Sequence, residues 1–178
     1  IVRHTGGIPR GKFPSRNNGR MVHHEGLLDL DAIYLFETSP KVIRYREQTL
    51  PVQYVDGARL RRYTPDFEIT LDTGEIITVE VKPTRSLADD EVSHKIDCIR
   101  AHYRRLDQSF VVLTEESLRQ EPRQSNLRWI YHQIPRLAPT REAISWALKA
   151  MHGEFPTSII AATVLLSPKS LDPFSALI

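Results

Sequence analysis

The chain lacks the features of several protein classes. Its 178 residues include one cysteine, Cys98, which excludes an internal disulfide and is typical of a reducing compartment. No Cys-x-x-Cys pair is present, and the seven histidines have no zinc-finger spacing. The most apolar stretch, residues 159–166, is too short to cross a bilayer. We therefore expect a soluble cytoplasmic protein without a membrane anchor or structural zinc.

Composition indicates a small globular enzyme. Hydrophobic residues make up 40% of the chain and charged residues 26%, which argues against long disorder. The length suits one domain of ordinary size with a short appendage. We find no internal repeat and no low-complexity tract. Cys98 lies among the apolar positions of a predicted helix, so we expect it to serve in packing.

Acidic residues are absent from the first twenty positions, which are basic and rich in glycine and proline. The basic residues there are Arg3, Arg10, Lys12, Arg16 and Arg20. The composition predicts an irregular basic arm over residues 1–20 that follows DNA phosphates and becomes ordered on binding. The alternative is a leader segment without a role. The net charge of +2 says little by itself.

The central part of the chain predicts a β-hairpin. Apolar and polar residues alternate from Phe67 to Leu71, residues 72–75 form a turn, and the pattern resumes over residues 76–82. Successive side chains of a strand face opposite sides, so Glu80 and Lys82 share one face. If the register brings Asp66 to that face, two carboxylates and one ammonium group converge.

Such a group of charges favours a divalent cation. Two neighbouring carboxylates repel each other, and Lys82 relieves only part of that repulsion. Oxygen ligands such as Asp66 and Glu80 suit Mg²⁺, with Mn²⁺ as a substitute. The pattern indicates a phosphodiesterase in which Lys82 orients water or stabilises developing charge. The alternative is an ordinary solvated hairpin face.

Glu25 precedes a predicted amphipathic helix over residues 26–38. We expect Glu25 in its first turn, as a further carboxylate of the site. The alternative is capping, because the helix dipole favours an acidic residue there in any case. The neighbouring His23 and His24 are ambiguous between DNA phosphate contact, proton transfer and simple surface exposure.

Several arginines are candidates for binding the DNA backbone. Arg59 and Arg61 share one strand face and Arg62 takes the other, all directly upstream of the predicted site. The alternative is an edge strand kept soluble by charge. A loop over the same site carries Arg85. The full predicted DNA-binding set is Arg59, Arg61, Arg62, Arg85, Arg16 and Arg20.

The order of predicted elements indicates an α/β fold with a mixed sheet flanked by helices. After the helix at 26–38 come strands near 42–45 and 49–55, the hairpin of 61–71 with 75–82, a helix at 88–107 and a strand at 109–114. The last strand is almost continuously apolar, which predicts a buried central position. Further helical patterns follow around 127–134, 140–153 and from 156 onward.

The motifs resemble a known family. Pro65-Asp66 followed by Glu80-Val81-Lys82 is similar to the PD-(D/E)xK nuclease superfamily. The segments Arg46-Glu47-Gln48, Tyr63-Thr64-Pro65-Asp66-Phe67 and Lys82-Pro83 resemble its TnsA branch, the endonuclease subunit of heteromeric bacterial transposases. The resemblance covers roughly residues 20–135. Glu80 stands where the best-known TnsA proteins have Gln, although Glu is commoner in the superfamily.

The resemblance implies a fold and a function. The fold is restriction-endonuclease-like, and the activity is Mg²⁺-dependent cleavage of double-stranded DNA at transposon ends. Asp66, Glu80, Glu25 and the Val81 carbonyl would bind metal, with Lys82 as the catalytic lysine. The implied partners are a transposase subunit and an ATPase regulator. The alternatives are another PD-(D/E)xK nuclease, for restriction, repair or junction resolution, and a non-catalytic DNA-binding assembly module.

We predict three regions. They are the basic arm at 1–20, the nuclease domain at 21–120 and a helical region at 121–178. The C-terminal helices suggest a small helix-turn-helix-like appendage, and the resemblance implies that it contacts transposition partners. The alternative is that these helices only cover an edge of the sheet.

Overall fold

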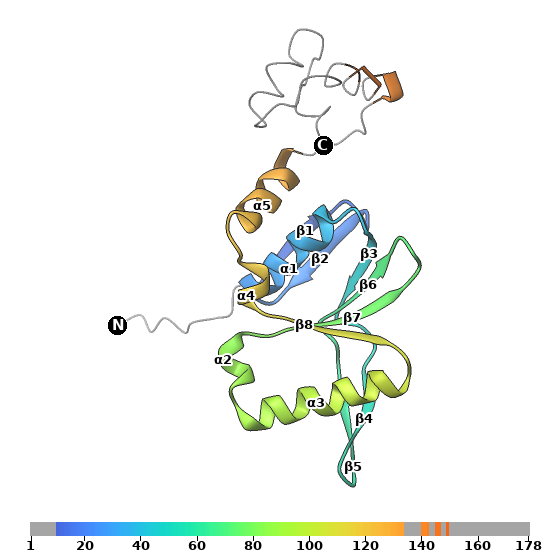
Figure 1. The fold of residues 1–178 in the computed structure, drawn as a ribbon, viewed down its shortest axis with the longest axis vertical. Helices are drawn as coiled ribbons and strands as arrows, with labels where there is room; N and C mark the ends of the chain where they lie inside the picture. Colours follow the sequence, from blue (N-terminus) through green and yellow to red (C-terminus); the bar gives the residue numbers. More distant parts are fainter. Residues whose placement is uncertain (1–9, 134–139, 143–144, 147–148, 150–178) are drawn as a thin grey trace, which may run out of the picture. The chain divides into compact units, whose positions relative to one another are not determined.

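A computed structural model describes residues 10–133, 140–142, 145–146 and 149 of the chain. The chain divides into two compact units, residues 1–127 and 128–178, and the first holds the sheet. Figure 1 shows the first unit as a sheet with helices on both faces. Among the described residues, no helix combines the length and the apolar character that crossing a membrane requires.

The described part of the chain has five consecutive strands, β3 to β7, between helices α1 and α2. The strands are β1 (Gly11–Ser15), β2 (Arg20–His24), β3 (Val42–Glu47), β4 (Val52–Asp56), β5 (Arg59–Tyr63), β6 (Phe67–Leu71), β7 (Ile76–Val81) and β8 (Ser109–Leu113). The helices are α1 (Leu27–Thr38), α2 (Thr84–Leu87), α3 (Asp90–Arg105), α4 (Glu115–Leu118) and α5 (Arg123–Gln133).

The main sheet is mixed and has the strand order β3-β6-β7-β8. β6 pairs antiparallel with β3 and β7, whereas β7 and β8 run parallel. Helix α1 packs on β3 and β7, and α3 packs on β8. Under α1 the core is aromatic, because the ring of Phe36 lies 5.5 Å from that of Tyr45 and 5.4 Å from that of Phe67.

A second core lies under α3. Tyr54, Tyr63, Ile99 and Tyr103 are all buried there, with Cys98 packed at the margin. The hairpin β4–β5 supplies the first two, so it is fastened to α3 although it lies outside the main sheet. Asp89 caps α3, since its carboxylate accepts hydrogen bonds from the amides of Glu91 at 3.0 Å and Val92 at 3.1 Å.

The α/β prediction is confirmed, and the architecture is restriction-endonuclease-like: a mixed sheet between helices. The helices predicted at 26–38 and 88–107 correspond to α1 and α3. The strands predicted at 42–45 and 49–55 correspond to β3 and β4.

The expectation of irregular structure near the N-terminus was wrong for residues 11–15. They form β1, which pairs with β2 in a hairpin. Buried Glu37 of α1 fastens this hairpin, because its carboxylate accepts hydrogen bonds from the Ser15 hydroxyl and the Arg16 amide. Tyr45 donates to the same carboxylate at 2.7 Å. Residues 1–9 lie outside the described part of the chain.

The continuous strand predicted over 61–71 was also wrong. It divides into β5, which pairs with β4, and β6, which joins the main sheet. Thr64, Pro65 and Asp66 separate the two strands. Pro65 has no amide hydrogen and disfavours a continuous ladder, so the chain changes partner at that point.

The central position predicted for the strand at 109–114 was wrong as well. β8 lies at the end of the sheet order within the described residues, and Val111 is 40% exposed. One face of the strand is covered, since the Phe110 ring stacks on Tyr103 at 5.3 Å. The residues of β8 other than Val111 are partly buried, so the apolar run belongs to a partly covered strand at the end of the sheet order. The helices predicted at 140–153 and from 156 onward fall largely outside the described residues.

Candidate active site

The site is built on the C-terminal end of β7. Glu80 is only 2% exposed, and its Oε1 lies 2.9 Å from the Lys82 Nζ. The predicted shared face of these two side chains is thus confirmed. Val79 and Val81 point the opposite way into the core, which holds the strand in this orientation.

Asp66 joins the same site from the loop before β6. Phe67 pairs with Val79, and one further step of that register sets Asp66 opposite Glu80. The Val81 amide donates a 2.8 Å hydrogen bond to Oδ2 of Asp66. The Asp66 carbonyl accepts from the amide of Gln48, whose φ of +44° is left-handed, at 2.9 Å. Both the side chain and the backbone carbonyl of Asp66 are therefore fixed by hydrogen bonds.

Electrostatics at Asp66 are unusual. Burial raises its pKa, the charge of Glu80 raises it further, and the Val81 amide and Lys82 only partly oppose this. The result is a pKa of about 7.

The pKa of Lys82 is also raised by its neighbours. Burial lowers its pKa, but the hydrogen bond and charge of Glu80, with the charges of Asp66 and Asp29, raise it above the ordinary value.

Tyr63 is a site residue that the sequence reasoning missed. Its hydroxyl donates a 2.6 Å hydrogen bond to Oε2 of Glu80, and its ring is buried. The Lys95 ammonium lies 5.7 Å from the centre of that ring. The position of Tyr63 two residues before Pro65 was the available signal, although only the change of strand partner turns its hydroxyl towards Glu80.

Asp29 is the second missed residue. It lies in the first turn of α1. Burial raises its pKa, while the hydrogen bond from the Glu25 amide and the charges of His24 and Lys82 lower it. Asp29 also raises the pKa of Asp66, so the two carboxylates act on each other. The charges of both carboxylates raise the pKa of Lys82.

Glu25, the predicted helix carboxylate, acts on Asp29, whose pKa its charge raises, but it is not among the groups that shift the pKa of Asp66 or Lys82. It precedes the N-cap Gly26 and is not in the first turn of α1. Its side chain is 54% exposed and lies 3.9 Å from the Arg10 guanidinium, and its amide donates to Asp29 at 3.0 Å. The helix carboxylate that interacts with Asp66 and Lys82 is therefore Asp29.

The two histidines beside Glu25 are held by local contacts. Nδ1 of His24 lies 3.1 Å from the Gly26 carbonyl, and the His23 amide donates to Glu47 at 3.2 Å. The His24 ring lies against Gly11, where a β-carbon would come within 2.4 Å of Nε2. A glycine at this position is what allows the ring to approach β1.

The comparison with known proteins agrees with this geometry. Residues 39–115 match the family model described as TnsA-like endonuclease N terminal. This segment is similar to the N-terminal domain of TnsA-like endonucleases. The matched segment contains Tyr63, Asp66, Glu80 and Lys82, whereas Asp29 and Glu25 precede it. No curated protein matches the chain.

The predicted DNA-binding arginines have different environments. Arg59, Arg62 and Arg85 are exposed. Arg61 is exposed but forms an ion pair with Asp56. Arg20 donates two hydrogen bonds to Glu47, at 2.7 and 2.6 Å.

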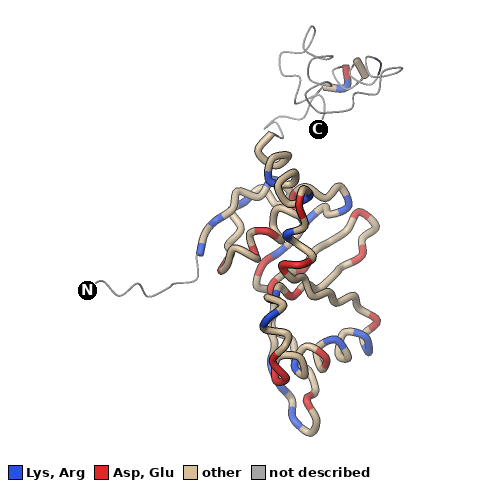
Figure 2. The backbone as a smooth tube through the Cα atoms, turned by 60° about the vertical axis from the view of Figure 1, so that its left-hand side comes forward, with Lys and Arg blue, Asp and Glu red and all other residues tan. Residues whose placement is uncertain are grey.

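The remaining predicted contact, Arg16, is exposed in the turn between β1 and β2. Figure 2 shows basic and acidic residues interspersed along the described backbone. Two of the predicted arginines, Arg20 and Arg61, pair with carboxylates, and the binding roles of the whole set remain predictions.

The donor types of the site suit a hard divalent cation. Lys82 forms an ion pair with Glu80 and is acted on electrostatically by Asp66 and Asp29, so three carboxylates face one ammonium in charge. Burial raises the pKa of Asp66 most, and the charges of Glu80 and Asp29 raise it further. Both Glu80 oxygens already accept a hydrogen bond, but a carboxylate oxygen keeps a second lone pair for a metal. Oxygen donors of this kind suit Mg²⁺ or Mn²⁺.

Proposed function

We propose that the protein is a metal-dependent DNA endonuclease that acts as the TnsA-like subunit of a heteromeric transposase. The convergence of Asp66, Glu80 and Lys82, with the pKa of Asp66 raised to about 7, carries the proposal. Nuclease activity agrees with the family of residues 39–115. Mg²⁺ dependence, cleavage at transposon ends and an ATPase regulator as a further partner are parts of this proposal.

Each residue of the site has a proposed task. Asp66, Glu80 and Asp29 would hold Mg²⁺, with the Val81 carbonyl as a further ligand. A metal bound there would supply Lewis-acid chemistry, polarising a phosphoryl oxygen and lowering the pKa of a water molecule. Lys82 would orient the attacking water and stabilise the negative charge that develops on the phosphate.

The surrounding groups keep these side chains in place. Tyr63 and Lys82 bind the two oxygens of Glu80 separately, so the buried carboxylate has one orientation. The Val81 amide does the same for Asp66. Arg59, Arg62 and Arg85, which are exposed, are the proposed contacts to DNA phosphates.

A calorimetric titration with Mg²⁺ and Mn²⁺ tests the metal centre without a partner or the correct DNA. We compare the wild type with Asp66→Asn/Glu80→Gln and with the control Asp72→Asn/Glu75→Gln. The control removes the same charges at the exposed turn of the same hairpin. We expect heat of binding in the wild type and the control, and its loss in the site variant.

The outcomes separate the alternatives. Equal binding by all three proteins, with and without DNA, would make the hairpin a scaffold and favour a non-catalytic assembly module. Metal binding followed by cleavage of DNA that lacks transposon ends, at undiminished rate, would assign another role such as restriction, repair or junction resolution. Cleavage only at transposon ends with the transposase present agrees with the proposal.

A further inference from the structure

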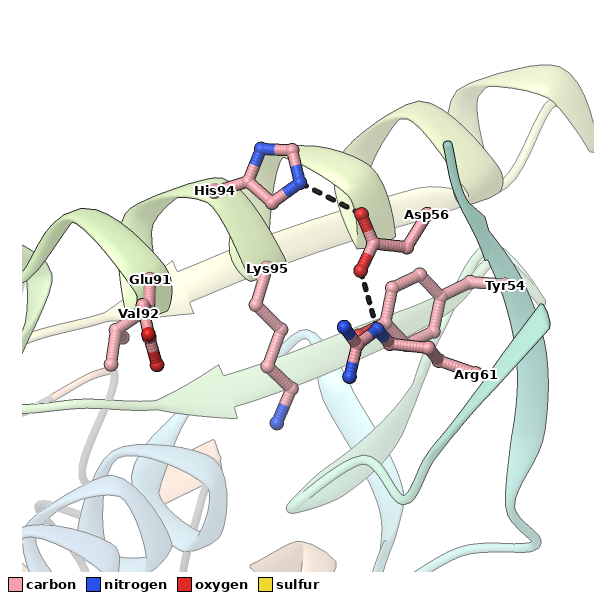
Figure 3. Close-up of a pocket in the computed structure, with 7 residues that line it drawn as sticks. All are labelled: Tyr54, Asp56, Arg61, Glu91, Val92, His94 and Lys95. Atoms are coloured by element: carbon pink, nitrogen blue, oxygen red, sulfur yellow. Dashed lines mark hydrogen bonds and ion pairs between the residues drawn. The ribbon is translucent and has the colours of Figure 1, made fainter. Parts of the chain in front are cut away.

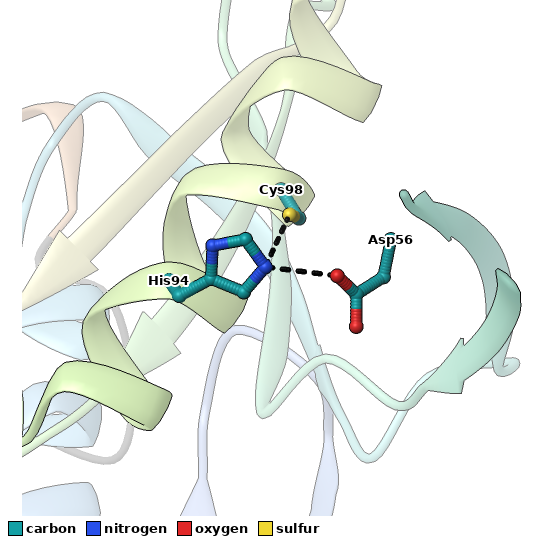
Figure 4. A group of neighbouring side chains, drawn as sticks. All are labelled: Asp56, His94 and Cys98. Atoms are coloured by element: carbon teal, nitrogen blue, oxygen red, sulfur yellow. Dashed lines mark hydrogen bonds and ion pairs between the residues drawn. The ribbon is translucent and has the colours of Figure 1, made fainter. Parts of the chain in front are cut away.

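Three metal-binding side chains meet away from the carboxylate site (Figure 4). Asp56 ends β4, while His94 and Cys98 are one turn apart on α3. One donor atom from each lies within 4.8 Å of the others. The His94 Nε2 is 2.8 Å from Oδ1 of Asp56 and 3.6 Å from Sγ of Cys98. The spacing of His94 and Cys98 follows from the helix, since residues i and i+4 share a face.

The contacts exclude a cysteine–histidine–aspartate catalytic relay. In such a relay the nucleophile and the carboxylate bind opposite nitrogens of the imidazole. Here Asp56 and Cys98 both approach Nε2, so neither can orient the ring for the other. Instead, the three side chains direct a potential metal-ligand atom towards the same region, as binding of a shared cation requires.

We propose that Asp56, His94 and Cys98 form a binding site for a transition metal of the Zn²⁺ class. Thiolate, imidazole and carboxylate are all common zinc ligands. Tetrahedral zinc holds a sulfur and a nitrogen ligand about 3.5 Å apart, given its usual bond lengths. The sulfur–nitrogen separation of 3.6 Å already matches. The nitrogen–oxygen pair has to open from 2.8 Å to about 3.3 Å.

The surroundings suit such a site. Figure 3 shows the cleft between β4–β5 and α3, with the Asp56 carboxylate between His94 and Arg61. Arg61 contacts Oδ2 of Asp56 and His94 contacts Oδ1, so one oxygen faces the proposed metal and the other keeps an orienting partner. With three protein ligands, water completes the coordination, and binding releases the Cys98 proton.

The site has a structural consequence. Asp56 belongs to the hairpin and the other two ligands to α3, so a bound metal joins the hairpin to the helix. The same hairpin ends at Tyr63, which holds Glu80. The metal therefore stabilises the hairpin that positions Tyr63, at a place separate from the proposed catalytic cation.

Co²⁺ titration of the full chain tests the site, because cobalt bound to a thiolate gives a charge-transfer absorption band. Cys98 is the sole cysteine, so any such band reports on it alone. We expect a band in the reduced wild type that Zn²⁺ abolishes by competition. Cys98→Ser should lose it, and Asp56→Asn and His94→Gln should each weaken affinity at least about tenfold.

Two controls make the result specific. Asp97→Asn removes a neighbouring exposed carboxylate of α3 and should leave the band unchanged. Asp66→Asn/Glu80→Gln should also retain it, which separates this site from the nuclease proposal. Absence of the band in folded protein with a titratable thiol overturns the proposal. So does an unchanged affinity in both Asp56→Asn and His94→Gln, because Cys98 would then bind cobalt without them.

Discussion

The Tyr63 hydroxyl and the Glu80 carboxylate form a buried hydrogen bond of 2.6 Å between two strands that are not paired with each other. Tyr63 lies on β5 of the projecting hairpin and Glu80 on β7 of the main sheet. The bond therefore joins the hairpin to the carboxylate site. Burial raises the pKa of Tyr63 most, and the charge of Glu80 and this hydrogen bond raise it further. The phenol therefore stays protonated and remains a hydrogen-bond donor.

Replacing Tyr63 with Phe should destabilise the protein and reduce cleavage together. The change leaves an oxygen of buried Glu80 without its donor, which costs about 1–3 kcal/mol. Urea unfolding measures the loss. Tyr103→Phe in the same core is the control, because it removes a hydrogen bond to the neutral Thr78 and should cost about 0.5–1.5 kcal/mol. An equal loss of cleavage in both variants would contradict a specific role for Tyr63.

Stability without metal should fall as the pH rises towards neutrality. The pKa of Asp66 is raised from 3.8 to about 7 in the folded state, so the folded protein holds this proton more tightly than the unfolded chain. The stabilisation is complete below about pH 4 and is lost as the pH passes about 7. Urea unfolding in chelator at several pH values measures the slope.

Asp66→Asn is the matching variant for that slope. It removes the titrating group and should flatten the curve between about pH 4 and 7. Glu47 affects only the acid end of that range, and with the opposite sign. Burial raises its pKa, but hydrogen bonds from Arg20 and from the amides of Glu47 and His23 lower it to about 2. Its contribution is present above its ordinary value of 4.5 and disappears as the pH falls through about 2. A wild-type slope in Asp66→Asn would assign the titration to another group.

Asp29→Asn should reduce metal-dependent cleavage at least about hundredfold, as expected when a charge that acts at the reaction centre is removed. Glu25→Gln should retain activity within about threefold of the wild type, because the Glu25 side chain is half exposed and faces Arg10. Both variants remove one negative charge near the start of α1. Cleavage assays with equal protein and DNA compare them, and the reverse order of effects would restore Glu25 as the helix carboxylate.

We expect Arg20 to contribute to folding stability and Arg62 to contribute to DNA affinity. Arg20 is bound to Glu47, so Arg20→Gln should lower stability more than DNA affinity. Arg62 is exposed on β5, so Arg62→Gln should weaken binding to all DNA sequences and reduce the salt slope by about 1. Binding measured at several salt concentrations, with unfolding in urea, distinguishes the two. An unchanged salt slope in Arg62→Gln would remove it from the proposed DNA contacts.

The alternation of residues along the sequence predicted the positions of Asp66, Glu80 and Lys82, because these depend only on strand and hairpin geometry. Glu80 and Lys82 share a face because strand side chains alternate, and the short turn at 72–75 fixes the register that brings Asp66 opposite Glu80. These relations involve neighbours in the sequence or across one hairpin. The sequence contained them in full.

Tertiary packing decided the rest. Asp29 and Glu25 are both acidic residues near the start of a helix, and only the rotation of α1 on the sheet determines which one faces Lys82. Tyr63 reaches Glu80 because β5 leaves the sheet before Pro65. The cluster of Asp56, His94 and Cys98 joins residues from a hairpin and a helix, so no linear spacing could reveal it.

The fully buried Asp31 of α1 determines where the nuclease domain can be cut. Its carboxylate accepts hydrogen bonds from Arg119 at 2.6 Å and from Gln124 at 3.0 Å. A fragment ending at the predicted boundary, residue 120, removes Gln124 and with it one hydrogen bond to this buried carboxylate. Asp29 lies on the same helix two residues away. A minimal nuclease therefore has to include the first turn of α5, nine residues beyond the end of the family match at 115.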